Sequence, residues 1–311
     1  MPRWTADDIP DLHGLTAVVT GANSGLGLRS ATALAAHGAM VVLACRDAGR
    51  AASALETVRE AATGADPSVA ALDLASLASV RECAAELAER HPAVDVLMNN
   101  AGVMAVPKGT TADGFERQIG TNHLGHFALT GLLLPTLLAA PAPRVVTVSS
   151  NAHKMGRMQL DDLSFARTRY SRWRAYGQSK LANLLFSAEL QRRATAAGTA
   201  LTSVAAHPGY AATNLTSGPA TGAAVLKPFL AVGDRIFGQS DQMGALPQLY
   251  AATMPDVGPD DYWGPDSFRE QRGHPTRVGR TDRAQDERAA RILWERSEEL
   301  TGVRYPWRTA G

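Results

Sequence analysis

A tyrosine and a lysine four positions apart, Tyr176 and Lys180, are the first candidates for chemistry in this chain of 311 residues. Residues i and i+4 of a helix lie one above the other, so the phenol and the ammonium group can share one face. A free tyrosine has a pKa of about 10, and a neighbouring positive charge favours the phenolate and lowers that pKa. The pair therefore suits general acid–base catalysis at an alcohol or carbonyl oxygen. A pair on an ordinary helix surface is the alternative, so the surrounding motifs must decide.

A glycine-rich segment near the amino terminus is the second candidate site. Residues 20–27 read TGANSGLG and connect a β-branched run to a helical segment that begins near Leu28. Glycines allow a sharp turn and a close approach of backbone N–H groups to a pyrophosphate, and a helix N-terminus adds partial positive charge. A tight turn without a ligand is the alternative. We assign dinucleotide binding to Gly21, Asn23, Ser24, Gly25, Leu26 and Gly27.

The elements that must position these residues alternate along the first two hundred residues. Segments with helical spacing, such as Ala51–Ala62 and Ser76–Arg90, lie between short runs that are apolar on both faces. Such runs are typical of strands buried in a parallel sheet. The pattern predicts an α/β fold, a single Rossmann-type doubly wound parallel sheet with helices on both faces. Its predicted strands are Thr16–Thr20, Met40–Ala44, Ser68–Leu72, Val94–Met98, Arg144–Ser149 and Leu201–Ala206.

The pattern changes after residue 207. Residues 208–255 are rich in Gly, Ala, Pro and Leu, and we interpret them as a mobile substrate lid. Residues 256–311 form a C-terminal extension that is polar at first and predicted to be helical over 283–300. No linker separates a second unit, so we predict one domain over residues 1–311, with 14–207 as its dinucleotide-binding and catalytic core.

Composition excludes several classes of function. The 31 basic and 30 acidic residues create no strong field for nucleic acid or an anionic membrane. The two cysteines, Cys45 and Cys83, form no CxxC pair, and no cluster has the spacing of a metal site. Acids stand near the amino terminus where a signal peptide would be apolar, and no run is long enough for an integral membrane segment. We expect a cytoplasmic protein without a metal, in which His123, His126 and His207 are structural.

The glycine spacing G-x-x-x-G-x-G and the motifs around Tyr176 resemble the short-chain dehydrogenase/reductase superfamily over about residues 14–215. Three further segments resemble its retinol dehydrogenase and WW-domain oxidoreductase branch. They are ACRD at 44–47, NHLGHF at 122–127 and SKLAN at 179–183. The long interval from Ser150 to Tyr176 points the same way, and we expect its insertion, Met155–Trp173, to border the substrate entrance.

The resemblance implies roles for residues that no local pattern singles out. Ser150 would bind the substrate oxygen, and Asn122 would hold a water that links Lys180 to solvent. Tyr176 would be the acid–base residue. The resemblance also implies that Tyr176 and Lys180 contact the cofactor. Further cofactor contacts are implied for Asp73, Leu74, Asn100, Ala101, Gly102, Pro208, Gly209 and Thr213.

The end of the second strand bears on the choice of cofactor. By the resemblance, Cys45 occupies the position where an acidic residue would hold the ribose of NAD, and Arg46 follows it. A guanidinium group there can pair with a 2′-phosphate. We therefore predict NADP(H) rather than NAD(H). The alternative is that Arg46 lies on the surface and Asp47 binds the ribose.

The predicted function is that of an NADP(H)-dependent oxidoreductase, which interconverts a carbonyl and an alcohol on a small lipophilic substrate. One alternative is a catalytically idle NADP(H)-binding sensor or partner protein. Another is a sugar-nucleotide epimerase or dehydratase, which the glycine spacing disfavours. An apolar strip on the Tyr176-bearing segment favours a homodimer, unless the insertion before Tyr176 covers the strip and leaves a monomer. The strip consists of Leu181, Leu184, Leu185 and Ala188.

Overall fold

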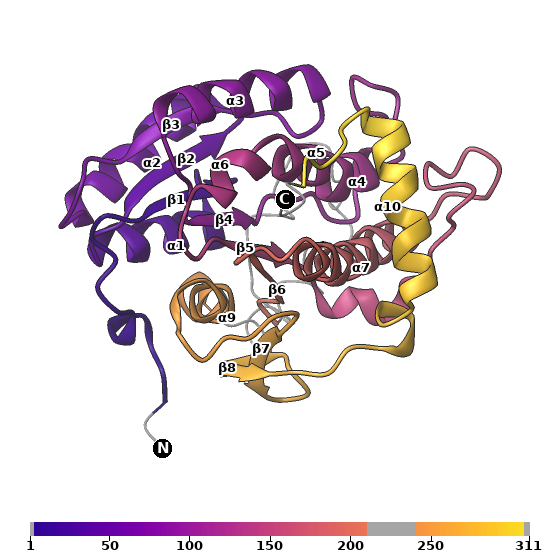
Figure 1. Cartoon of the computed structure of the whole chain (residues 1–311). Coiled ribbons are helices and arrows are strands. Elements are labelled where there is room, and N and C mark those ends of the chain that lie inside the picture. Colours follow the sequence, from indigo (N-terminus) through magenta and orange to yellow (C-terminus); the bar gives the residue numbers. More distant parts are fainter. Residues whose placement is uncertain (1–2, 210–239, 308–311) are drawn as a thin grey trace.

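A central eight-stranded sheet organises the computed structural model, which describes residues 3–209 and 240–307 (Figure 1). The strand order is β3-β2-β1-β4-β5-β6-β7-β8; neighbouring strands are parallel as far as β7, and β8 runs antiparallel to β7. This arrangement confirms the predicted doubly wound α/β fold. The strands are β1 (Thr16–Thr20), β2 (Met40–Cys45), β3 (Ser68–Ala71), β4 (Val96–Asn99), β5 (Arg144–Val148), β6 (Thr202–Ala206), β7 (Tyr262–Ser267) and β8 (Arg272–Arg277).

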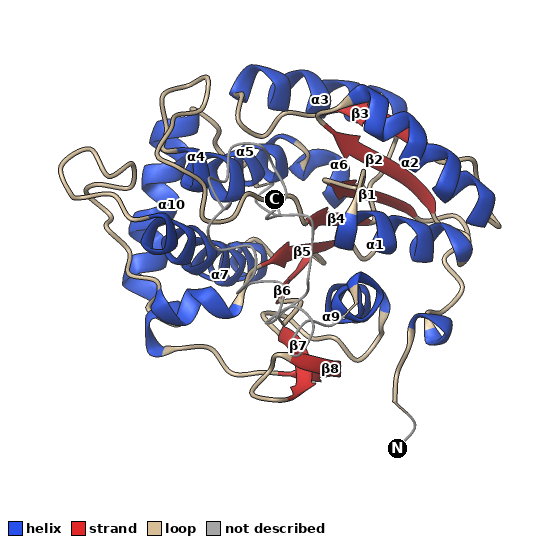
Figure 2. Ribbon diagram, turned by 180° about the vertical axis from the view of Figure 1, so that it is seen from behind, coloured by secondary structure: helices blue, strands red, loops and turns tan. Residues whose placement is uncertain are grey.

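Helices cover both faces of this sheet (Figure 2). On one face, α1 (Gly25–Ala36), α2 (Ala48–Ala61) and α9 (Asp241–Thr253) share a buried apolar cluster with alternate strand residues. On the other, α3 (Leu77–Arg90), α5 (Gly125–Leu132) and α7 (Arg172–Ala196) do the same. Apolar residues on both faces of each inner strand are therefore required, because neither face meets water. The predicted cap of α3 is present, since the Ser76 side chain accepts from the Ser79 amide.

Shorter helices complete the described part of the chain. Two of them flank the site discussed below: η2 (Gly120–Leu124), which is π-helical, and η3 (Asn151–Met155), which is 3-10 helical. The closing helix predicted over 283–300 is α10 (Glu287–Thr301). The others are η1 (Ala6–Asp8), α4 (Arg117–Ile119), α6 (Leu134–Leu138) and η5 (Asp282–Ala284). No helix in residues 3–209 or 240–307 combines the length and apolarity needed to cross a bilayer.

The apolar strip of α7 is covered by the chain itself. Leu181, Leu184 and Leu185 are buried in one cluster with Leu163 of the insertion and Leu293 of α10. In Figure 1, α10 runs alongside α7. The strip is therefore not available as a surface for a second copy. The expectation of a homodimer through these residues is corrected, and the insertion does cover them, as the alternative proposed.

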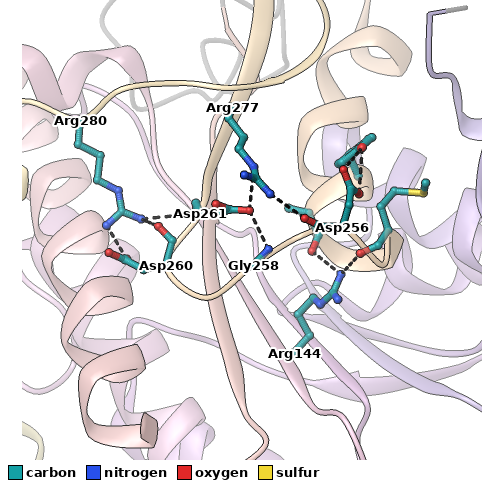
Figure 3. A network of polar contacts seen from close by, with 10 residues as sticks. Arg144, Asp256, Gly258, Asp260, Asp261, Arg277 and Arg280 are labelled. Carbon is teal, nitrogen blue, oxygen red and sulfur yellow. Dashed lines mark hydrogen bonds and ion pairs between the residues drawn. The ribbon is translucent and has the colours of Figure 1, made fainter. Parts of the chain in front are cut away.

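The C-terminal extension contains two strands that its polar composition did not predict, β7 and β8. Its arginines and aspartates bind one another and the backbone (Figure 3). Arg277 donates to the Asp256 carbonyl at 2.7 Å and pairs with Asp261 at 3.2 Å, and Arg280 pairs with Asp260 at 2.6 Å. Arg144 on β5 donates to two carbonyls after or within α9. Charged side chains here fasten the edge of the sheet.

The range predicted as a lid, 208–255, divides into two parts. Residues 210–239 lie outside the described residues. The last part is the helix α9, which Ser240 caps by accepting from the Met243 amide and which packs against α1. Ala245 and Leu249 of α9 are buried in the core. Residues 241–253 are thus part of the sheet's covering layer, and any lid must lie before them.

Candidate active site

The loop between β1 and α1 shows the close approach that its glycines predict. Gly21 and Gly25 have φ angles of 68° and 52°, in the left-handed region that glycine adopts freely. A Cβ atom on Gly27 would lie 2.4 Å from the Gly21 carbonyl oxygen, so a larger residue cannot fit without a shift. Ser24 is the N-cap of α1, but its side chain makes no capping hydrogen bond. The first amide groups of α1 therefore remain open to a phosphate, which fits a dinucleotide.

A buried threonine, Thr20, fastens this loop to the end of β4. Its hydroxyl accepts from the N–H groups of Asn100 and Ala101, both at 2.9 Å, and Asn100 Nδ2 donates to the Thr20 carbonyl at 2.8 Å. The same hydroxyl lies 2.9 Å from His126 Nε2. His126 Nδ1 lies 3.1 Å from the Asn122 carbonyl, which can only accept, so Nδ1 carries the hydrogen and Nε2 accepts from Thr20. Thr20 thus connects the phosphate loop to Asn122.

The residues after β2 bear on the cofactor's adenosine end. The Cys45 sulfur is buried where the amide groups of Ala22 and Asn23 face it, and burial raises the pKa of this thiol to about 11. Arg46 is exposed, and no ion pair joins it to another residue of the described part of the chain. The Asp47 carboxylate caps α2 by accepting from a backbone amide at 2.9 Å. Asp47 is thus engaged locally, whereas the Arg46 guanidinium is available to an anionic ligand.

The turns after β3 and β4 bring further predicted residues to this edge. Asp73 is half-buried and accepts from the Ala75 amide at 2.9 Å, while the buried Leu74 packs against α5 at Gly125. A Cβ atom on Gly102 would lie 3.2 Å from Asn122 Oδ1 and 3.5 Å from Lys180 Nζ. The turn at 100–102 therefore runs from the phosphate loop to the predicted catalytic residues.

Ser150 and Tyr176 meet where β5 ends beside α7. The Tyr176 hydroxyl faces the Ser150 side chain, a neighbour that lowers the pKa of the phenol as a hydrogen-bond partner would. Two glycines allow this approach, because a Cβ atom on Gly156 would lie 2.4 Å from the carbonyl oxygen of Gly177. The segment after Ser150 therefore rests directly on the helix residue that follows Tyr176. The two hydroxyl groups can converge on one oxygen atom of a substrate.

Lys180 lies one turn further along α7 and is buried. Its Nζ donates to the Val148 carbonyl at 3.0 Å and lies 5.9 Å from the centre of the Tyr176 ring. The Lys180 carbonyl accepts from Ser149 Oγ at 2.8 Å, which ties α7 to the end of β5. No carboxylate forms an ion pair with Lys180 in the described residues, and burial lowers the pKa of its ammonium group to about 8.

The pKa of Tyr176 differs from the expected lowered value. Burial of the phenol raises this pKa above its ordinary value, and the hydrogen bond with Ser150 opposes the rise. The ammonium group of Lys180 lies against the ring, where it stabilises a phenolate oxygen less than a direct contact would. In this structure Tyr176 is therefore a protonated phenol at neutral pH, the form that can donate a proton to an oxygen atom.

Asn122 lies in the π-helical turn η2, a wide turn found frequently at functional sites. Its side chain exchanges two hydrogen bonds with the backbone of Val103, at 2.8 and 2.9 Å. Its Nδ2 also donates to Ser179 Oγ at 2.9 Å. Asn122 thus links the turn after β4 to α7. The water that the resemblance assigns to it stays a prediction.

The segment after β6 is described only at its start. Pro208 and Gly209 come after His207, the first residue beyond β6, and Gly209 has a φ angle of 69°. A Cβ atom on Gly209 would lie 2.3 Å from the carbonyl oxygen of Gln271, so the β7–β8 hairpin packs against this segment. Thr213 lies outside the described residues.

The insertion before Tyr176 lies beside the start of α7. A cavity of about 500 Å³ there is lined by Pro107, Lys108, Arg169, Tyr170, Ser171, Arg172 and Arg174. Three large apolar side chains are exposed on nearby elements: Met155 at the end of η3, Trp173 on α7 and Phe268 in the hairpin. The Trp173 ring stands edge-on to the Tyr176 ring, with centroids 6.1 Å apart. Of these exposed apolar side chains, Trp173 is the one in contact with the Tyr176 ring.

Sequence reasoning missed two features of the site. His126 is structural, as expected, but the sequence did not show what it connects: its ring, kept neutral because burial lowers its pKa to about 4, joins Asn122 to Thr20. The i, i+4 spacing of Asn122 and His126 could have indicated this contact. The hairpin residues 268–271 were missed altogether, because nothing in a polar loop far along the chain shows what it will pack against.

Comparison with known proteins gives one consistent result. A family model described as short chain dehydrogenase matches residues 15–221. Retinol dehydrogenase 13 from Homo sapiens is 39% identical over 300 residues, which cover 95% of this chain and 87% of that protein. A crystal structure of an uncharacterized protein from Mycobacterium paratuberculosis is 47% identical, with a TM-score of 0.81, covering 98% of this chain and 100% of that one. A short chain dehydrogenase from Escherichia coli CFT073, complexed with NADPH, is 26% identical, with a TM-score of 0.55 and coverages of 67% and 82%.

Substitution of Gly27 by alanine should damage the phosphate loop. The added methyl group would collide with the Gly21 carbonyl, so we expect dinucleotide binding to weaken by roughly tenfold or more. Titration of NADPH fluorescence would measure this. Gly49→Ala is the matched control, because its added atom would lie 3.5 Å from its nearest neighbour, an ordinary contact. Equal affinity of Gly27→Ala and the control would contradict the assignment of the loop.

Proposed function

Because the chain belongs to the short-chain dehydrogenase family, and to its retinol dehydrogenase-like branch, we propose that it is an NADP(H)-dependent oxidoreductase. Its reaction would interconvert a carbonyl and an alcohol on a small lipophilic molecule. The observation that carries this proposal is the meeting of the Ser150 and Tyr176 hydroxyls beside Lys180, a buried ammonium group without a carboxylate partner in the described residues.

The residues present fit a nicotinamide dinucleotide at the edge of the sheet. The open amide groups of α1 suit a pyrophosphate, and the exposed Arg46 suits a 2′-phosphate. Gly102 lies between this loop and Lys180, which would hold the nicotinamide ribose. A related dehydrogenase complexed with NADPH supports the choice of cofactor. When bound in its reduced form, the cofactor supplies a hydride to the carbonyl carbon.

The protein's own groups would act on the substrate oxygen. In the reductive direction, Ser150 and Tyr176 donate hydrogen bonds to the carbonyl oxygen, which stabilises the negative charge that develops there. Tyr176 then transfers its proton to that oxygen. The Lys180 ammonium group stabilises the phenolate that remains, and Asn122 would hold the water through which the proton is replaced. Burial keeps the Tyr176 phenol protonated, which is the form that the reductive direction requires.

The surroundings of Tyr176 support a lipophilic substrate. The exposed Trp173 side chain, edge-on to the Tyr176 ring, gives the site an accessible apolar surface. A protein 39% identical to this chain is named for retinol, a lipophilic alcohol. Bulky aldehydes, ketones and secondary alcohols are therefore the first compounds to test.

Removal of the Tyr176 hydroxyl should nearly abolish turnover. We expect Tyr176→Phe to lower kcat by roughly 10²- to 10⁴-fold, because the general acid is lost while the ring still fills its place. NADPH consumption with a panel of lipophilic aldehydes and ketones would measure this, and NADPH binding should persist. Tyr250→Phe is the control, since that hydroxyl bonds Asp256, away from the site. Wild-type turnover by Tyr176→Phe would refute the proposed role.

Loss of the Arg46 guanidinium should reduce the preference for NADPH. One charge-assisted contact is worth about 1.5–3 kcal/mol, so kcat/KM for NADPH should fall roughly 10- to 100-fold in Arg46→Ala while the value for NADH changes little. Arg50→Ala, a neighbouring exposed arginine on α2, should keep the wild-type ratio. A wild-type enzyme that prefers NADH would overturn the cofactor assignment but not the proposed reaction.

The rate should also depend on pH through Lys180. Its charged form is lost as pH rises through about 8, so kcat/KM for NADPH, which reports ionisations of the free enzyme, should fall above that pH. The pKa is lower in the folded than in the unfolded chain. Above pH 8 the folded protein thus binds fewer protons, and this group's contribution to stability rises while activity falls. Lys180→Arg keeps its charge at every pH tested, so it should remove the fall in kcat/KM. A fall in kcat/KM at the same pH in the wild-type protein and in Lys180→Arg would argue against Lys180 as its cause.

A further inference from the structure

The tip of the β7–β8 hairpin has a strained backbone. Three consecutive residues that are not glycine, Phe268, Arg269 and Glu270, have φ angles of 52°, 55° and 64°. L-residues rarely adopt this region, and they persist there only where surrounding contacts determine the conformation. Such strain commonly serves a function, so the contacts of these residues are informative.

Glu270 is the residue of this tip that touches the active-site segments. Its carboxylate accepts from Lys154 Nζ at 2.8 Å, and its main-chain carbonyl accepts from Asn151 Nδ2 at 2.9 Å. Both partners belong to η3, which directly follows Ser150. The same carboxylate lies 3.5 Å from Nε2 of His207, the residue that precedes Pro208. One side chain therefore joins the segment after Ser150 to the segment after β6.

The helix η3 is rigidly connected to Ser150 itself. The His153 ring donates from Nδ1 to the Ser150 carbonyl at 2.7 Å, and the Ala152 amide donates to Ser150 Oγ at 3.1 Å. Gly156, just after η3, packs against the backbone of Gly177 on α7. A displacement of η3 would therefore move the Ser150 hydroxyl relative to Tyr176.

The His207 ring is fixed as firmly. Its Nδ1 accepts from the Gly209 amide at 3.2 Å, so in the neutral ring Nε2 carries the hydrogen and lies 3.5 Å from the Glu270 carboxylate. The side chain is fully buried, and a Cβ atom on Gly264 would lie only 2.1 Å from Nε2, so a glycine is required at 264 to leave room for the ring. The pKa of Glu270 is lowered to about 2, first by His207 and then by Lys154. The carboxylate is thus charged at every pH of interest.

We propose that Glu270 is a positioning residue, which holds Ser150 and the His207–Gly209 segment in fixed register across the end of the sheet. The proposal rests on the proposed function, in which Ser150 binds the substrate oxygen and the segment after β6 contacts the nicotinamide. As a consequence, one carboxylate determines the relative position of the group that would bind the substrate oxygen and the segment that would hold the hydride donor. A misplacement of about 1 Å in such a site costs on the order of 100-fold in rate.

Replacement of Glu270 by glycine separates positioning from stability. Glycine adopts a φ of 64° freely, so Glu270→Gly removes the carboxylate while favouring the observed backbone. Arg269→Gly is the matched control, with the same substitution at a φ of 55° and an exposed side chain. We expect kcat to fall roughly 10- to 100-fold in Glu270→Gly alone, with KM for NADPH changed less than about threefold and the thermal midpoint no lower than in the control.

Acetate should restore part of the lost rate, because the Glu270 side chain is one-quarter exposed and a small carboxylate can enter the space between Lys154 and His207. Chloride at the same ionic strength should not. A purely structural role would not respond to acetate. Turnover of Glu270→Gly within twofold of the control, or a loss that acetate does not relieve, would overturn the proposal.

Amide hydrogen exchange tests the proposal without any substrate. Exchange over 151–156 and 207–209 should be faster in Glu270→Gly than in Arg269→Gly, and equal exchange would overturn the positioning role. Failure of the proposed function looks different. In that case the wild-type protein would consume no NADPH with any carbonyl compound, or Tyr176→Phe would match it, while the exchange result would still stand.

Discussion

The buried hydroxyl of Thr20 is the contact on which the arrangement of the site depends. It accepts hydrogen bonds from two backbone amides of the turn after β4 and donates a hydrogen bond to His126. The other ring nitrogen of His126 donates to the Asn122 carbonyl. Thr20, His126 and Asn122 are buried, and their polar groups would lose considerable free energy without their partners. The phosphate loop, the end of β4 and the helix that carries Asn122 therefore cannot shift independently.

From Asn122 the same rigidity extends to the acid–base pair. Asn122 is bonded to Ser179 on α7, and α7 is tied back to β5 through Ser149, Lys180 and Asn183. This arrangement destabilises the charged form of Lys180, a buried ammonium group that has a carbonyl for a partner in place of a carboxylate. Its pKa is lowered for this reason. A group that is destabilised in the folded chain is suited to bind ribose hydroxyls and to respond to charge on Tyr176.

Much of this could be predicted from the sequence, for physical reasons. The strands β1, β2 and β4–β6 are buried on both faces and so form uninterrupted apolar runs in the sequence, and their polar ends mark the edge of the sheet where the site lies. The strands β7 and β8 could not be predicted, because only the first four residues of β7 are buried, two of them Gly264 and Pro265, and β8 is polar and half-buried at most, which leaves no apolar pattern. The apolar strip of α7 was equally ambiguous, since nothing in it tells whether a second copy or Leu293 of α10 covers it.

The β7–β8 hairpin, which the sequence did not predict, packs against the segments that contain the proposed active-site residues. Strand order places β5, β6 and β7 side by side, so the segments that leave their carboxyl ends must meet. Ser150 and His207 follow β5 and β6, and the hairpin that follows β7 brings Glu270 against both segments. The C-terminal extension is therefore not an appendage to a complete catalytic core. Buried Tyr262 and Trp263 and the ion pairs near them hold the sheet edge together. That edge in turn holds the hairpin beside the segment after Ser150, the residue proposed to bind the substrate oxygen.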